Sequence, residues 1–527
     1  MKKFKLFGLV ALFIFSACQK DASDALVQKE MTDPESSEVS ARFGSDFWDH
    51  DERDLIFYAL GEGNKLDKFR SDDSDELLNS AIITGLQQDE KIMAIDFRPA
   101  TGQLYGLGST SRIYVINPQT GIALAIGTGP FTPALSGTIA GFDFNPTVDR
   151  IRIVTNTGQN LRLNPETGVI AATDLPINAV TNAMVTSVAY DNNFAGAATT
   201  TLFDIDVTTD KLYRQNPPNN GTLEEIGSLQ YNLEGEGGFD IAPPDVSNYF
   251  QTSYKALAIY QVNKKSALFS IDLVTGKARK IEKFNRSLKY YGIAIPTKAV
   301  AYAVSGNNFL IFNPNKISGV VTKPIAGLQA GETLQGIDFR PVNGQMYGLG
   351  SNSGIYTINA SSGLATFVAA LSVPLNGTSF GIDFNPVVDR IRIVSNTGQN
   401  LRVNPADGAA TTDMSLNPGA PAVSAAAYAN NFAGTAATTL YVIDASTDKL
   451  YIQNPPNDGT LTEVGRLNIN IDASNGFDIS GNSNRAFGIF TNGNTTRIYR
   501  VDLLTGRARF RNSFPGSVTG FTIGLGF

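Results

Sequence analysis

The sequence of 527 residues contains only one cysteine and one histidine. Catalysis and metal binding that depend on these two residue types are therefore nearly excluded. The histidine, His50, lies in a short charged stretch ahead of the first expected strand, where a solvated side chain is the simplest interpretation. Without clusters of Cys or His there is no zinc or transition-metal site of the usual ligand set. One G-x-S-x-G match, at residues 377–381, has no histidine to activate its serine. We therefore predict no catalytic residue.

Charged residues are also scarce, at 17% of the chain, whereas 50 residues are glycine and 10% are aromatic. This balance argues against disorder and suits a protein rich in strands and turns. The net charge is −7, and no cluster of Lys and Arg is apparent. A chain this acidic is a poor candidate for binding nucleic acid, so we expect no such partner.

The N-terminus has the features of an export signal. Lysines at positions 2, 3 and 5 precede an apolar run over residues 6–15, which is too short to span a bilayer. Phe15-Ser16-Ala17-Cys18 follows and resembles the lipobox of bacterial lipoproteins. The resemblance implies a signal peptide over 1–17 and fatty acylation, such as palmitate, on Cys18, which would bind the membrane. The alternative is an ordinary secreted protein with an incidental cysteine.

The residues that follow indicate where the protein would be anchored. Position 19 is Gln rather than the Asp that resembles an inner-membrane retention signal, which favours the outer membrane. Gln19-Lys20-Asp21 resembles, more weakly, the tracts that send some lipoproteins to the cell surface. Residues 18–52 are polar, with few large apolar side chains, and are expected to form a flexible tether.

The rest of the chain is a tandem duplication, over 53–296 and 297–527. The segments Asp143–Pro165 and Asp383–Pro405 differ at only three positions. Within each half, a run of the type Gly-apolar-Asp-apolar opens a unit of about 45 to 50 residues, which is the length of a propeller blade. Six units have the Asp, and looser versions start near Thr186, Tyr291, Ser424 and Gly520, which makes ten units.

Each unit contains four short alternating runs separated by tight turns of the type Asn117-Pro118-Gln119-Thr120-Gly121. No amphipathic helix is apparent. The predicted fold is all-β, a β-propeller of ten four-stranded blade units arranged as two five-blade repeats.

Closure of the propeller has two alternatives. Residues 291–295 could pair with Leu55–Leu60 and close a first five-bladed ring. They could instead form a hairpin with residues 300–304, leaving Gly520–Phe527 to pair with Leu55–Leu60 in one ten-bladed ring. The number of blades in known propellers favours two rings. The short connector 296–299 favours one ring, and this is the arrangement we expect.

These motifs resemble a bacterial family of uncharacterised exported domains, domain of unknown function 4394. The resemblance rests on segments such as GFDFNPTVDRIRIVTNTGQNLR, NNFAG and QNPPNNGTL, which occur in two copies with small differences. It implies export and a propeller-like body but no activity.

Two sets of residues are candidates for binding. The first is the Asp of the six motifs, which would line the central channel and could form an acidic collar for Ca²⁺, the only cofactor we consider, or for a cationic ligand. A structural role, in which each carboxylate accepts hydrogen bonds from a neighbouring turn or pairs with an arginine such as Arg98, is favoured. This set comprises Asp96, Asp143, Asp240, Asp338, Asp383 and Asp478.

The second set lies in the two nearly identical segments and could offer amide and guanidinium groups to a sugar or peptide. Here too a structural role is favoured. This set comprises Asn156, Gln159, Asn160 and Arg162, with Asn396, Gln399, Asn400 and Arg402 in the second copy.

The predicted function is a non-enzymatic binding or adhesion module at the cell surface, with an extracellular glycan or a protein as ligand. One alternative is a hydrolase or lyase that acts on extracellular carbohydrate through carboxylates. The other is a purely architectural protein of the envelope.

Overall fold

The computed structural model describes residues 55–73, 76–244, 256–284, 288–473 and 475–527. These residues form forty strands in ten four-stranded antiparallel sheets, with only two short 3₁₀ turns, η2 (Pro218–Asn220) and η3 (Pro456–Asp458). The predicted all-β fold of ten blade units is confirmed. In the part of the chain so described, no helix is long and apolar enough to cross a membrane. The signal peptide, Cys18, the tether and His50 lie outside the described residues.

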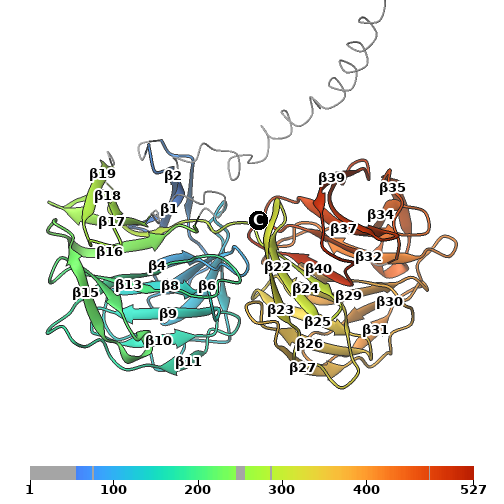
Figure 1. Ribbon diagram of the computed structural model, residues 1–527, viewed down its shortest axis with the longest axis horizontal. Coiled ribbons are helices and arrows are strands. Elements are labelled where there is room, and N and C mark those ends of the chain that lie inside the picture. Colours follow the sequence, from blue (N-terminus) through green and yellow to red (C-terminus); the bar gives the residue numbers. More distant parts are fainter. Residues whose placement is uncertain (1–54, 74–75, 245–255, 285–287, 474) are drawn as a thin grey trace, which may run out of the picture. The chain divides into compact units, whose positions relative to one another are not determined.

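The first five sheets, which we call ring 1, come from the first sequence repeat (Figure 1). From the innermost strand outward they are β4 (Ile92–Phe97), β5 (Leu104–Gly108), β6 (Arg112–Ile116) and β7 (Ala123–Ile126); β8 (Ala140–Asn145), β9 (Arg150–Thr155), β10 (Asn160–Leu163) and β11 (Ile170–Thr173); β12 (Val185–Tyr190), β13 (Leu202–Asp206), β14 (Lys211–Gln215) and β15 (Leu223–Ser228); β16 (Glu234–Ile241), β17 (Ala256–Val262), β18 (Lys265–Ile271) and β19 (Ala278–Lys283); and β20 (Tyr290–Ala294), β1 (Ile56–Gly61), β2 (Lys65–Arg70) and β3 (Asn79–Ile82).

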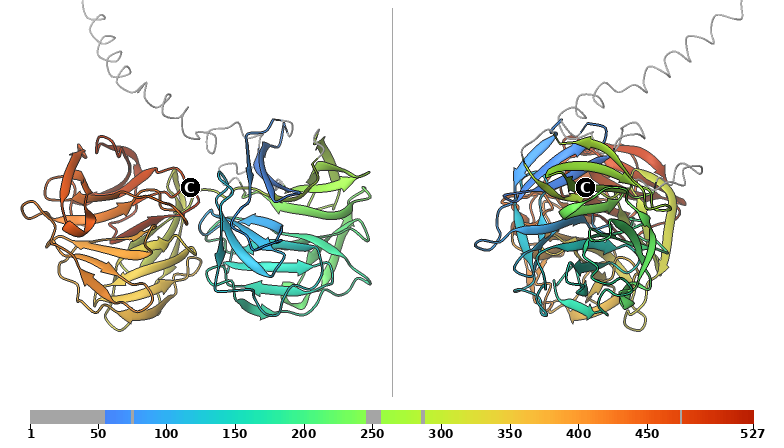
Figure 2. Two further views of the ribbon diagram at one scale, coloured as in Figure 1. Left: turned by 180° about the vertical axis from the view of Figure 1, so that it is seen from behind. Right: turned by 90° about the vertical axis from the view of Figure 1, so that its left-hand side faces the viewer.

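The other five sheets, ring 2, come from the second repeat (Figure 2). Their strands follow the same order. They are β24 (Leu334–Arg340), β25 (Gln345–Gly350), β26 (Gly354–Ile358) and β27 (Ala365–Ala370); β28 (Phe380–Asn385), β29 (Arg390–Ser395), β30 (Asn400–Val403) and β31 (Ala410–Thr412); β32 (Val423–Tyr428), β33 (Leu440–Asp444), β34 (Lys449–Gln453) and β35 (Leu461–Arg466); β36 (Asn475–Ile479), β37 (Ala486–Asn492), β38 (Thr495–Val501) and β39 (Ala508–Ser513); and β40 (Gly520–Ile523), β21 (Ala301–Ser305), β22 (Asn308–Asn313) and β23 (Lys316–Pro324).

Each ring closes on itself, so the expected single ten-bladed ring is wrong. Strand β20 pairs with β1 through Tyr58 and Ala294, and its other face contacts β4. Strand β40 pairs with β21 through Ala303 and Phe521, and contacts β24. The connector between β20 and β21 is therefore a link between rings and not a hairpin. Closure within each repeat gives both β20 and β40 a partner strand from their own repeat.

The turns between the third and fourth strands form as predicted. In the first blade, Asn117 Oδ1 accepts the N–H groups of Gln119 and Thr120 at 2.9 and 3.1 Å, and Gly121 closes the turn with φ of +77°. Asp272 occupies the same place in another blade and makes the same two bonds, to Val274 and Thr275. These turns fix the register of the outer strands.

The innermost strands approach one another closely where the motif has glycine. A Cβ atom added to Gly141 would lie 2.6 Å from the backbone nitrogen of Val188, and one added to Gly238 would lie 2.5 Å from that of Ile293. These glycines let the channel narrow until side chains two residues further along can meet across it. The motif therefore brings the aspartates together.

Contacts between the rings occur within the compact unit that comprises residues 53–527. Tyr302 of ring 2 donates its hydroxyl hydrogen to the carbonyl of Ala100 at 2.9 Å. Arg98 of ring 1 is fully buried, is paired with Asp149 and Glu166, and also donates to the carbonyl of Gly344 at 3.1 Å. A buried cation with this many partners ties the two repeats together.

Candidate functional site: two buried aspartate triads

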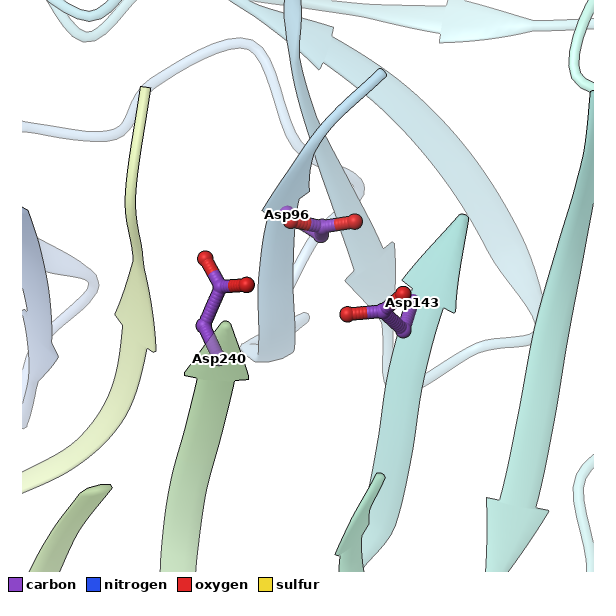
Figure 3. Close-up of side chains that lie close together, drawn as sticks. All are labelled: Asp96, Asp143 and Asp240. Atoms are coloured by element: carbon purple, nitrogen blue, oxygen red, sulfur yellow. The ribbon is translucent and has the colours of Figure 1, made fainter. Parts of the chain in front are cut away.

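Each ring brings three of the predicted aspartates to one level of its channel. In ring 1, the carboxylates of Asp96, Asp143 and Asp240 come from β4, β8 and β16 and converge, with one oxygen from each within 4.8 Å of the others (Figure 3). The corresponding positions on β12 and β20 are Ala189 and Ala294. We call this set triad 1. Each of its aspartates is only 1% exposed.

Triad 2 is the equivalent set in ring 2 and comprises Asp338, Asp383 and Asp478. Its members are also 1% exposed. The two other innermost strands have Ala427 and Thr522 at this level. At this level the rings therefore differ in that Thr522, whose Cβ carries a hydroxyl and a methyl, stands in ring 2 where ring 1 has Ala294.

The carboxylates join each innermost strand to the next. Asp96 Oδ2 accepts the N–H of Phe144 on β8 at 3.0 Å, and Asp143 Oδ1 accepts the N–H of Tyr190 on β12 at 3.1 Å. Asp240 makes the same bond to Ile295, just after β20, at 2.5 Å. Ring 2 repeats the pattern. Charge-assisted bonds of this kind pin neighbouring blades.

One carboxylate oxygen of triad 1 has no hydrogen-bond partner among the described residues. Asp143 Oδ2 is buried and unsatisfied, whereas Asp96 and Asp240 each use one oxygen on their own strand and the other on the next blade. An unsatisfied buried carboxylate oxygen is costly unless a proton or a cation lies beside it.

Burial raises the pKa of every aspartate in both triads, and repulsion from neighbouring carboxylates adds to this for four of them. Burial raises the pKa of Asp240 and that of Asp478 to about 7. Burial, with the added repulsion of Asp240, raises the pKa of Asp96 well above its usual range. Asp143 responds in the same way to burial and to the charges of its two neighbours. The triads thus retain protons near neutral pH unless a cation is bound.

The spacing of the triads suits a small cation. Oxygen ligands lie 2.3–2.6 Å from Ca²⁺, so ligand atoms on opposite sides of the ion are about 5 Å apart at most. The 4.8 Å limit within each triad agrees with this span. Three carboxylates with one unsatisfied oxygen could therefore hold Ca²⁺, although Ca²⁺ takes six to eight ligands and several oxygens here already accept backbone N–H groups.

The arginines expected near the aspartates pair elsewhere. Arg98 pairs with Asp149 and Glu166, and Arg152 pairs with Asp174 at 2.6 Å. The partners of the triad carboxylates are backbone N–H groups of their own and the next innermost strand, with the hydroxyl of Thr522 in triad 2, and not turns or guanidinium groups. Sequence could not reveal this, because it depends on the stagger between blades.

The second predicted set is used within the blades. Asn160 accepts from Arg152 at 2.6 Å and donates to the carbonyl of Pro218 at 3.0 Å, while Arg162 forms an ion pair with Asp174. Ring 2 has the same bonds from Asn400 and Arg402.

The remaining members of this set tie together neighbouring loops. Asn156 and Gln159 accept backbone N–H groups of Thr138 and Ser136 at 3.1 and 2.9 Å. Asn396 and Gln399 do the same in ring 2. These eight side chains lie on the second blade of each ring and do not converge with the triads.

Two features were not identified from the sequence. Thr522 was not recognised, because only the alignment of the five innermost strands shows that it belongs to triad 2. The sequence analysis found no cluster of Lys and Arg, and this is wrong for the sheet β36–β39. Four arginines lie close together there: Arg485, Arg500, Arg509 and Arg511. The alternating Arg507-x-Arg509-x-Arg511 was the available signal.

Comparison with family models shows the class of protein. The model described as "Domain of unknown function (DUF4394)" matches residues 65–294 and again 308–522. The chain belongs to this family and contains two tandem copies of the domain, one in each ring. A search of curated proteins found no match.

Among solved structures, the chain is similar to the extracellular domain assigned to a hybrid two component system of B. thetaiotaomicron, with 11% identity, 89% of this chain and 79% of that one covered, and a TM-score of 0.24. It is also similar to the tricorn protease, with 13% identity, 87% of this chain and 44% of that one covered, and a TM-score of 0.26. A third similar structure is PorZ, a surface component of the type-IX secretion system of Porphyromonas gingivalis, with 12% identity, 88% of this chain and 58% of that one covered, and a TM-score of 0.26. Similarities this low have no bearing on function.

Proposed function

We propose that the protein is a non-enzymatic binding module of the bacterial envelope, with an extracellular glycan or a protein as its ligand. The observation that carries this proposal is the burial of the triads. Among the described residues, the triads are where acids with raised pKa converge, as an enzyme would need. Each aspartate, however, is 1% exposed and is hydrogen-bonded to the backbone of the next blade.

Access along the channel supports the same conclusion. In ring 2, the space next to the triad is a cavity of about 10 Å³, lined by residues such as Gly336, Ile337 and Phe521. This volume admits about one water molecule. A sugar ring is far larger than this cavity, which supports a role for triad 2 other than action on a carbohydrate. Two rigid rings instead offer repeated outer surfaces, which can gain avidity for a repetitive ligand.

The alternative of a carboxylate-dependent hydrolase or lyase is tested by an activity screen of residues 46–527 on extracellular polysaccharides. We expect no turnover. Asp143→Asn and Asp383→Asn variants distinguish the source of any activity, with exposed Asp407→Asn as the matched control. Reproducible turnover that is lost in either triad variant, and kept in the control, would overturn the proposal.

The envelope location rests on Cys18. We propose that acylation of this cysteine anchors the body at the outer membrane, exposed at the cell surface. Changing Cys18→Ser should abolish labelling by an alkyne fatty acid and release the protein from membranes, because no second anchor is expected. Labelling that persists in the variant would contradict the anchor.

A further inference from the structure

A cluster of four arginines lines one face of the sheet β36–β39 in ring 2. Arg500 on β38 lies opposite Arg509 on β39, and on its other side lies opposite Phe487 on β37. Arg485 is two residues before Phe487 and so shares this face. Arg511 follows Arg509 at an irregularity in the pairing of β39. We call these four residues the arginine cluster.

Three members of the arginine cluster form no ion pair with an acidic side chain of the described residues, although the nearby Asp502 attracts Arg500. Within the described ranges, the guanidinium groups of Arg485, Arg500 and Arg511 form no ion pair or hydrogen bond, and Arg485 and Arg500 are half-buried. The nearby acid, Asp502, accepts the backbone N–H groups of Leu504 and Thr505 in its own turn. Burial, followed by repulsion from Arg511, lowers the pKa of Arg485, and burial with repulsion from its neighbours lowers that of Arg500.

Ring 1 shows that the fold does not require two of these charges. The equivalent sheet is β16–β19, in which Ser270 lies opposite Arg279 as Arg500 lies opposite Arg509. The residue equivalent to Arg511 is Ile281, which packs against the apolar core between this sheet and its neighbour. Ring 2 therefore has positive charge at two positions, Arg500 and Arg511, where ring 1 has the neutral Ser270 and Ile281.

We propose that the arginine cluster binds the oxyanion groups of an anionic polysaccharide. Guanidinium groups form paired, charge-assisted hydrogen bonds with carboxylate, sulfate and phosphate oxygens, and they bind them better when partly withdrawn from water. The repulsion that Arg485 and Arg500 experience from neighbouring arginines is a cost that a bound oxyanion would reduce. A nucleic acid is a poorer fit, because it needs many phosphate contacts and the chain has a net charge of −7. The inference deepens the proposed binding function by naming a ligand class.

The test measures binding of polygalacturonate and dextran sulfate to residues 46–527, with neutral dextran, polyphosphate and single-stranded DNA as comparisons. The variant Arg500→Ser with Arg511→Ile copies the ring 1 residues Ser270 and Ile281. Arg466→Ser removes one exposed charge from the neighbouring sheet and serves as the control. We expect saturable binding of at least one anionic polysaccharide, weakened at least tenfold in the double variant and less than twofold in the control.

A stability measurement separates binding from folding. The double variant should melt at the same temperature as the parent protein or higher, because repulsion is relieved, and the bound polymer should raise the melting temperature of the parent alone. Binding that the double variant retains, equal loss in the control, tighter binding of DNA, or no binding of any anionic polysaccharide would each overturn the inference. Turnover in the activity screen would overturn the proposed function alone, since the variants Arg500→Ser and Arg511→Ile change outer strands of the sheet and leave Asp478 on β36 in place.

Discussion

Thr522 places its hydroxyl oxygen 3.0 Å from Oδ2 of Asp478. The same oxygen lies 3.0 Å from Oδ1 of Asp338. A hydroxyl has one hydrogen to donate, so it can satisfy both carboxylates only if one of them is protonated and donates in return. The raised pKa of both aspartates agrees with such a shared proton. Triad 2 is thus a proton-sharing network, and Ala294 removes this link from triad 1.

Replacing Thr522 should measure how much its hydroxyl group contributes to the free energy of unfolding. Thr522→Ala leaves two buried carboxylate oxygens with one partner fewer, which typically costs about 1–3 kcal/mol. Thr522→Ser keeps the hydroxyl and should retain most of the stability. Denaturant unfolding of the three proteins at pH 6 makes the comparison. Equal losses in the Ser and Ala variants would show that the methyl group, not the hydroxyl, matters.

The triads should make the protein more stable in acid than in weak alkali when divalent cations are chelated. A carboxyl group with a pKa raised on folding stabilises the native state fully below its unfolded pKa, near 4, and this contribution is lost as the pH rises through its folded pKa. For Asp240 and Asp478 the loss runs from about pH 4 to about pH 7. Each group changes the free energy of unfolding by at most about 1.4 kcal/mol per pH unit.

The measurement is chemical unfolding in EDTA between pH 4.5 and pH 8. Asp143→Asn removes one ionisable group while keeping an oxygen for the N–H of Tyr190, so it should reduce the slope. A free energy of unfolding that rises with pH over this range would contradict the raised pKa values.

Calcium should oppose this loss if the triads hold a cation. At pH 8 the carboxylates are charged, so millimolar Ca²⁺ should raise the melting temperature by several degrees, whereas at pH 5 protons compete and the effect should be small. Asp143→Asn with Asp383→Asn should weaken the response, and exposed Asp407→Asn should not. The same melting temperature with Ca²⁺ and with EDTA at pH 8 would show that the triads bind protons alone.

The blade units were predictable from the sequence because each one repeats the same local chemistry. The Gly-apolar-Asp motif marks an innermost strand, and the Asn117 and Asp272 turns mark the outer hairpins. Ring closure was not predictable, because β20 and β40 are both short apolar strands that fit either partner. Only the observed pairing of Tyr58 with Ala294 decides between the two arrangements.

The site was predictable only in part. The six aspartates were identified from their spacing, but their partners depend on how one blade is staggered against the next. The arginine cluster could not be predicted for a similar reason, because it depends on how neighbouring strands are aligned. Arg485 and Arg500 are far from Arg511 in sequence and meet only through the register of three strands.

Because each ring closes on itself, one ring should fold without the other. Residues 297–527 expressed alone should be monomeric and unfold in one cooperative transition, with some loss of stability from exposing the surface that Tyr302 and Ala100 share. Residues 53–296 provide the matched comparison. Light scattering and thermal unfolding are the measurements. Aggregation of both halves through open strand edges would favour a single ring.

The central claim is that the protein binds a glycan and leaves it intact, and one experiment measures both properties. Residues 46–527 are applied to an array of extracellular glycans, and each retained glycan is then incubated with the protein and weighed by mass spectrometry. The account predicts that at least one glycan, with carboxylate or sulfate groups, is retained and that its mass is unchanged. Cleavage of the retained glycan that disappears in the Asp143→Asn variant, or retention of no glycan at all, would contradict it.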